Sequence, residues 1–189
     1  MEKKLSFIIP AYNCADFMEE TIGSVITQLP DDCELVIVDD GSTDETLAMV
    51  RSLRRKDERV HFVSFSRNFG KEAAMLAGFD YAKGDAVIVM DADMQHPVSV
   101  IPDMLRYWEE GYDDVFAQRQ GSKESWLKRK SSHWYYKLLQ SLTRVPIQKD
   151  TGDFRLLDRS CVEALRQMRE SERNTKGMYS WIGFHKKES

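Results

Sequence analysis

Residues 86–97 read AVIVMDADMQHP, and this stretch indicates the class of fold. It opens with an apolar run, residues 86–90, that is rich in β-branched side chains, as is typical of a short buried strand. Two acidic residues, Asp91 and Asp93, follow the run directly. In open α/β sheets, ligands bind beyond the carboxyl ends of the strands. The stretch therefore predicts a strand of an α/β sheet with a polar site at its carboxyl end.

Similar apolar runs alternate with amphipathic segments along the chain. Four of these runs are expected to be further strands: residues 5–9, 35–38, 60–65 and 114–118. Helical spacing of apolar residues predicts helices at residues 17–29, 72–82, 98–108 and 159–168. A further helix is expected around residues 47–53, with Ser42 and Thr43 before it as N-caps. This order predicts one domain over residues 1–189, with a mainly parallel central sheet covered by helices on both faces.

Composition restricts the classes of function. The chain has 189 residues, of which 42% are hydrophobic and 31% charged, and its net charge of −4 disfavours a nucleic-acid partner. The three cysteines lie far apart, which favours reduced thiols in the cytoplasm. We see no signal peptide and no apolar stretch long enough to span a bilayer.

Basic and aromatic residues gather between residues 123 and 149. This segment holds seven basic residues and one acidic residue, and residues 124–142 fit a helix that carries Trp126, Trp134, Tyr135 and Tyr136. Such a helix suits an anionic membrane surface, where aromatic rings and basic side chains are both favoured. Alternatively, it is a solvated helix whose aromatic residues pack on the domain or on another subunit of a homo-oligomer.

Three acidic groups are expected at the same edge of the sheet. Asp39 and Asp40 follow one predicted strand, Asp91 and Asp93 follow another, and Asp153 lies in the segment TGDFR. Neighbouring carboxylates repel each other unless a cation binds them, and Mg²⁺ or Mn²⁺ prefers such oxygen ligands. The pattern predicts a divalent cation that carries phosphate oxygens. The alternative for the first two groups is an ordinary turn, with a helix cap at residues 39–42.

Several other chemistries lack their usual motifs. The chain contains neither of the glycine-rich phosphate loops G-x-x-x-x-G-K and G-x-G-x-x-G, which disfavours P-loop and classical dinucleotide-binding proteins. It also lacks the G-x-S-x-G elbow of esterases, and its four histidines do not have the spacing of a zinc site.

An ordered set of motifs resembles a known family. The segments PAYN at 10–13, VDDGSTD at 38–44 and DAD at 91–93 are similar to glycosyltransferase family 2, which has the GT-A fold. The segments at 66–72, 92–97, 151–159 and 180–184 resemble its polyprenyl-phosphate branch, which includes bactoprenol glucosyltransferases and dolichol-phosphate mannose synthase. The resemblance covers nearly the whole chain.

The resemblance implies a role for each matching residue. The nucleotide sugar would be bound by Pro10, Tyr12, Asp39, Asp40, Asp91, Ala92 and Arg119. Mg²⁺ or Mn²⁺ would be held by Asp91, Asp93 and Gln95. Asp153 and Asp93 would be catalytic, and Arg155 would lie near the acceptor phosphate.

The implied reaction is transfer of a hexose, glucose by resemblance, from a UDP-sugar to a polyprenyl phosphate, with inversion, at the cytoplasmic face of the membrane. Residues 123–189 would contain the helices that face the acceptor and the membrane. The chain departs from the branch at Cys14, where a glutamate is common, and in ending at Ser189, where two membrane helices usually follow.

Three alternatives remain open. The acceptor could be a saccharide or protein hydroxyl, as in a family 2 transferase that acts in solution. The chain could be a nucleotidyltransferase, although the N-terminal glycine-rich basic loop of that class is absent. It could also be a binding module without catalysis, although Asp91, Asp93 and Asp153 are all present.

Overall fold

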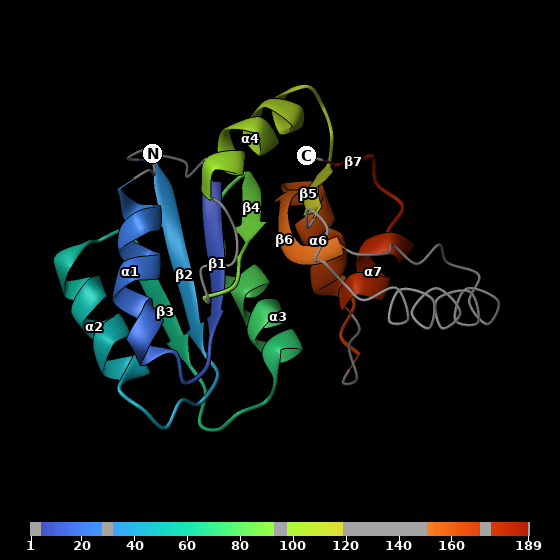
Figure 1. The fold of residues 1–189 in the computed structure, drawn as a ribbon. Helices are drawn as coiled ribbons and strands as arrows, with labels where there is room; N and C mark the ends of the chain where they lie inside the picture. Colours follow the sequence, from blue (N-terminus) through green and yellow to red (C-terminus); the bar gives the residue numbers. More distant parts are fainter. Residues whose placement is uncertain (1–4, 28–31, 93–97, 119–150, 171–174, 189) are drawn as a thin grey trace, which may run out of the picture.

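A computed structural model describes residues 5–27, 32–92, 98–118, 151–170 and 175–188. Within these ranges seven strands form one sheet in the order β3-β2-β1-β4-β6-β5-β7 (Figure 1). Their bounds are β1 Leu5–Ala11, β2 Cys33–Asp39, β3 Val60–Ser64, β4 Ala86–Val89, β5 Asp114–Gln118, β6 Thr151–Asp158 and β7 Lys186–Glu188. The five strands predicted from apolar runs are all confirmed, whereas β6 and β7 were not predicted.

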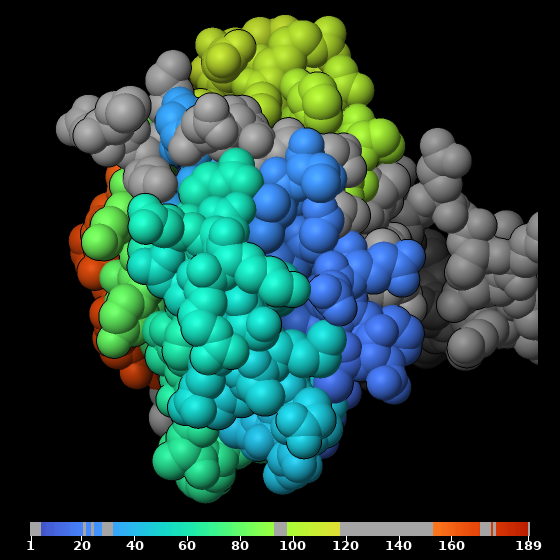
Figure 2. Space-filling model, turned by 90° about the vertical axis from the view of Figure 1, so that its left-hand side faces the viewer, coloured from blue at the N-terminus to red at the C-terminus, as the bar shows by residue number. Residues whose placement is uncertain are grey.

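Helices cover both faces of the sheet, as predicted. They are α1 Ala15–Ile26, α2 Thr46–Lys56, α3 Lys71–Tyr81, α4 Ile101–Glu109, α6 Arg159–Gln167 and α7 Thr175–Trp181, with a 3₁₀ turn, η1 Val98–Val100, before α4. One buried cluster joins α1, α2 and α4 to one face, and a second joins α3, α6 and α7 to the other. In Figure 2, α1 and α2 lie side by side below α4.

The residues of β1 explain why both faces need a covering layer. Phe7 and Ile9 belong to the cluster with α1, and Ile8 between them packs with α3. All three side chains are fully buried. Since successive residues of a strand point to opposite faces, a continuous apolar run such as this one requires helices on both sides.

The sheet is parallel over β1 to β4, but β6 runs antiparallel to both of its neighbours, β4 and β5. Its register pairs Ala86 with Asp158 and Val89 with Arg155. The start of β6 therefore lies at the carboxyl end of β4. The predicted parallel arrangement holds for most of the sheet, and this one reversed strand places Asp153 at the same edge as Asp91.

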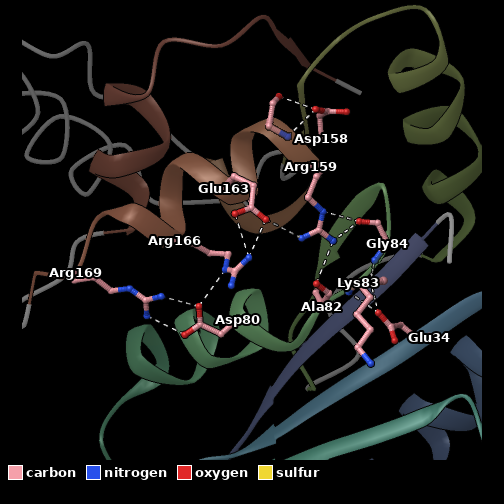
Figure 3. Close-up of polar contacts among 12 residues, drawn as sticks. Glu34, Asp80, Ala82, Lys83, Gly84, Asp158, Arg159, Glu163, Arg166 and Arg169 are labelled. Atoms are coloured by element: carbon pink, nitrogen blue, oxygen red, sulfur yellow. Dashed lines mark hydrogen bonds and ion pairs between the residues drawn. The ribbon is translucent and has the colours of Figure 1, made fainter. Parts of the chain in front are cut away.

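Polar contacts fasten α6 and the end of β6 to the N-terminal half of the fold (Figure 3). Asp80 on α3 receives hydrogen bonds from Arg166 at 3.1 Å and from Arg169 at 2.8 Å. The guanidinium of Arg159 donates to the carbonyl oxygens of Ala82, at 3.1 Å, and Gly84. These contacts fix β6 relative to α3, and so fix Asp153 relative to the N-terminus of that helix.

The sequence predicted a side-chain cap before α2 and a basic helix at residues 124–142. Ser42 and Thr43 do not cap α2, because the N-cap residue is Glu45 and no side-chain cap hydrogen bond forms there. The predicted basic helix at 124–142 lies outside the described residues. Within the described ranges, no helix is both long and apolar enough to cross a membrane.

Candidate active site

The carboxyl ends of β1, β2 and β4 meet the beginning of β6 at one edge of the sheet. Ala11 of β1 pairs with Asp39 of β2. Continuing the register of β4 and β6 by two residues brings Asp91 opposite Asp153. The fold thus gathers the three predicted acidic groups, as far as they are described, at the edge where ligands bind in such sheets.

Lys71, the first residue of α3, joins two of these groups. Its ammonium nitrogen lies 2.6 Å from Oδ1 of Asp91 and 2.6 Å from Oδ2 of Asp153. The two carboxylate side chains are 22% and 14% exposed. Burial lowers the pKa of Lys71, but the hydrogen bonds and charges of Asp153 and Asp91 outweigh it and raise the pKa above its usual value. The lysine is therefore a charged bridge between the two acids.

This pair of acids suits a hard cation. Asp91 and Asp153 offer oxygen atoms alone and already share one positive charge, and Mg²⁺ and Mn²⁺ prefer such ligands. Among the described residues, no group of three or more acids, histidines and cysteines is arranged to hold a metal. Asp93 and Gln95 lie outside those residues, so the structure places only Asp91 of the three predicted metal ligands.

The side chains of Asp39 and Asp40 are buried and accept hydrogen bonds from other residues of the protein. Asp39 is 1% exposed and accepts hydrogen bonds from the amide of Ser42, at 3.1 Å, and the hydroxyl of Ser64, at 2.8 Å. Asp40 is 3% exposed, and its two oxygens accept from the amides of Phe69 and Gly70 at 2.7 and 2.9 Å. Both carboxylates therefore have partners within the protein, and their predicted contact with the nucleoside stays a prediction.

The bonds made by Asp40 determine where Lys71 stands. Phe69 and Gly70 are the two residues before it, and Gly70 has a φ of 97° that only glycine adopts readily. Asp40 therefore anchors the turn from which α3 begins. Lys71 lies within the family-like segment at 66–72, but no role was predicted for it from the sequence.

Three other residues predicted to contact the nucleotide sugar lie just beyond or near the ends of β1 and β4. Tyr12 is 47% exposed just beyond β1, Pro10 is partly exposed, and Ala92 is 7% exposed. Tyr12 is thus exposed at the edge where the acidic groups gather. Arg119 lies outside the described residues.

Arg155, which was predicted to lie near the acceptor phosphate, is buried between two strands and a helix. Its side chain is fully buried, and Nη1 donates to both oxygens of Asp114 at 3.0 and 2.8 Å. Its guanidinium carbon lies 3.9 Å from the ring centre of Tyr179 on α7. Through these contacts Arg155 joins β6, β5 and α7. Its predicted place near the acceptor phosphate stays a prediction.

A pocket of about 260 Å³ lies at the opposite edge of the sheet. It is lined by residues near the starts of β2 and β3 and the end of α3, among them Glu34, His61 and Tyr81. Glu34 accepts from the hydroxyl of Ser6 and the amide of Lys83, each at 2.7 Å. Because its lining residues lie near the starts of the strands, this pocket is separate from the acidic groups at their carboxyl ends.

Two curated proteins with glycosyltransferase names are similar in sequence to nearly the whole of this chain. CsbB of Bacillus subtilis, a protein named as a glycosyltransferase, is 42% identical over 97% of this chain and 56% of its own. A bactoprenol glucosyl transferase of Shigella phage SfV is 39% identical over 95% of this chain and 60% of its own. The chain thus spans somewhat more than half the length of these relatives.

Solved structures of other glycosyltransferases share the fold. Staphylococcus aureus TarS in complex with UDP-GlcNAc has a TM-score of 0.65 at 18% identity, over 98% of this chain and 58% of its own. The mannosyltransferase PcManGT of Pyrobaculum calidifontis, in complex with GDP-Man and Mn²⁺, has a TM-score of 0.70 at 20% identity, over 97% and 53%. These likenesses show the GT-A fold. The family model for glycosyl transferase family 2 matches residues 6–166, and together with the relatives from Bacillus subtilis and Shigella phage SfV it shows that the chain belongs to that family and is a glycosyltransferase.

Proposed function

We propose that this chain transfers glucose from UDP-glucose to a polyprenyl phosphate, with inversion at the anomeric carbon and with the help of Mg²⁺ or Mn²⁺. The observation that carries the proposal is the single ammonium of Lys71 between Asp91 and Asp153. It brings an acid at the end of β4, on the donor side, next to an acid at the start of β6, on the acceptor side. The bactoprenol glucosyl transferases among the relatives support the sugar and the lipid.

The residue roles in this proposal are those that the family resemblance implies, adjusted to the contacts of the described residues. A bound divalent cation would neutralise the charge of the leaving diphosphate. The ligands of this cation would be Asp91, Asp93 and Gln95. Tyr12 would contact the nucleoside, while Asp39 and Asp40 would shape the loops around it. Arg119 would contact a phosphate of the donor. TarS with UDP-GlcNAc supports a UDP-sugar donor, since it shares the fold.

Asp153 would orient the acceptor. A sugar hydroxyl needs a base within reach of its proton, whereas a lipid phosphate is already ionised at neutral pH. With a lipid phosphate, Asp153 and Lys71 together would hold an anionic acceptor in line with the donor, and positioning would supply much of the rate. We place this reaction at the cytoplasmic membrane face, with the basic segment 123–149 against the lipid surface.

Asp153→Asn tests the proposal. We expect the variant to bind UDP-glucose at saturating Mn²⁺ as the unaltered protein does, while kcat for transfer to undecaprenyl phosphate falls about a hundredfold, since a group acting in the reaction step affects turnover more than binding. Calorimetry would measure the binding and radiolabelled product would measure the transfer. Asp103→Asn is a matched control, because Asp103 makes an exposed pair with Arg106 on α4.

Three results would contradict the proposal. Loss of donor affinity in Asp153→Asn with unchanged turnover at saturating donor would remove Asp153 from the reaction step. Transfer to a free saccharide, with none to the lipid phosphate, would instead identify a family 2 transferase with a hydroxyl acceptor. Binding of the donor without any transfer would indicate a binding module.

A further inference from the structure

Lys71 holds the place that a cation would take between two acids. Its Nζ lies 2.6 Å from an oxygen of Asp91 and 2.6 Å from one of Asp153, and its side chain is 41% exposed. One cation within reach of two otherwise repelling carboxylates stabilises both. Asp91 is also a proposed metal ligand, so the lysine and the metal would compete for the same carboxylate.

We propose that Lys71 is a positioning residue that couples donor binding to the orientation of Asp153. In the free protein its ammonium bridges the two acids. When a divalent cation arrives with the donor diphosphate, it displaces Lys71 from Asp91, and the lysine stays bonded to Asp153. This inference rests on the proposed function, because it assigns Asp91 to the donor side and Asp153 to the acceptor side.

Electrostatics favours an exchange of this kind. A divalent cation bound to Asp91 would repel an ammonium that stayed within hydrogen-bonding distance of the same carboxylate. Lysine carries a compact charge with three donors on a flexible four-carbon stem, so it can release one acid and keep the other. Asp153, at 14% exposed, then keeps its counter-charge after the metal has bound.

The backbone at Lys71 is fixed, so the movement would be confined to the side chain. Asp40 binds the amides of Phe69 and Gly70 just before it. Glu72, just after it, accepts from the amide of Thr175 at 3.2 Å and so ties α3 to α7. With both neighbours held, the ammonium can change partners while α3 stays in place.

Titration of the full chain with Mn²⁺ alone tests the competition. We expect Lys71→Met to bind Mn²⁺ about two- to fivefold more tightly than the unaltered protein, because one competing charge is gone. Lys71→Arg keeps the charge and should bind close to the unaltered value. Lys56→Met is the matched control, since Lys56 pairs only loosely with Glu19, at 3.6 Å, on the far side of the fold. Lys71→Gln replaces the methionine variant if that protein does not fold.

Turnover tests the positioning. With UDP-glucose, Mn²⁺ and undecaprenyl phosphate, kcat of Lys71→Met should fall about tenfold or more, because a misplaced group costs turnover, while KM for the donor stays equal or falls. Lys71→Arg should recover part of kcat, which a purely structural role would not predict.

Equal Mn²⁺ affinity in Lys71→Met and the unaltered protein, or no Mn²⁺ binding by either, would overturn the inference. A rise in donor KM at constant kcat would also overturn it, because Lys71 would then be a simple donor ligand. If the unaltered protein transferred no sugar, the proposed function would fail, while the Mn²⁺ titration would still decide whether Lys71 competes with the metal.

Discussion

Gly41 has no side chain, and the main chain of Arg67 fills the space that one would take. Gly41 has a φ of 69°, and a Cβ there would lie 2.3 Å from the carbonyl carbon of Arg67. Both the conformation and the contact require glycine. Since Asp40 precedes Gly41 and anchors Gly70, this close approach helps to place the start of α3.

Gly41→Ala should therefore lower the free energy of unfolding by about 2 kcal/mol or more, since it adds a left-handed alanine to a backbone clash. Urea unfolding followed by circular dichroism would measure it. Gly23→Ala is the matched control: Gly23 lies in α1 with nothing within 4 Å of a Cβ, so alanine should raise stability by up to about 1 kcal/mol. Equal effects of the two substitutions would contradict this account of Gly41.

Individual site residues were predictable from the sequence to different degrees. Asp91 was predictable because it directly follows a strand-like apolar run, and Asp153 because its motif resembles a family. The inward placement of Asp39, Asp40 and Arg155 was not, because it depends on contacts with residues distant in the sequence. Lys71 was missed for the same reason: its partners are brought to it by β4 and β6.

At the scale of elements, the junction of β6 and α6 depends on Asp158. Its carboxylate caps α6 by accepting from the amide of Ser160 at 2.8 Å, and it also accepts from the indole of Trp108 on α4 at 3.0 Å. Burial raises the pKa of Asp158, but these hydrogen bonds outweigh it and hold the pKa below its usual value. The ionised form is therefore the one that stabilises the fold.

Asp158→Ala should cost about 1 kcal/mol of stability at neutral pH through loss of the cap. Because the folded pKa lies below the unfolded value, this stabilisation is present above about pH 4 and is lost as the pH falls through the folded pKa. Urea unfolding from pH 7 downward should show the two proteins converging. Asp158→Asn keeps a good cap and should lose less at pH 7. A difference that grows on acidification would refute this role of the carboxylate.

Elements were predictable where their pattern is local. The strands β1, β2 and β4 each contain a continuous apolar run, and α6 places Cys161, Val162 and Leu165 on one buried side. β6 was not predicted because Asp153 and Arg155 interrupt its apolar residues. The ion-pair partners of these two residues, Lys71 for Asp153 and Asp114 for Arg155, come from other parts of the chain. A strand whose charges are paired at long range has no local signature.

At the scale of the whole molecule, the sheet brings the proposed donor side and the proposed acceptor side together at one edge. The parallel strands β1 to β4 follow the alternating pattern expected of a nucleotide-binding α/β fold. The reversed strand β6 adds Asp153 from a segment that follows the basic stretch 123–149. Acceptor chemistry and the proposed membrane contact are therefore adjacent in the sequence, which is the basis for the last prediction.

The basic stretch should bind the chain weakly to anionic membranes. Each lysine or arginine near such a surface contributes about 1 kcal/mol, and salt screens the attraction. In co-sedimentation with phosphatidylglycerol vesicles, we expect binding at low salt that is lost at high salt. Replacing Lys128, Arg129 and Lys130 by glutamate should abolish it. Replacing Arg51, Arg54 and Arg55 of α2, which is also basic, is the matched control and should leave it unchanged. If the chain ignored anionic vesicles at low salt, or if only the α2 replacements reduced binding, the acceptor would have to reach Asp153 without help from this segment.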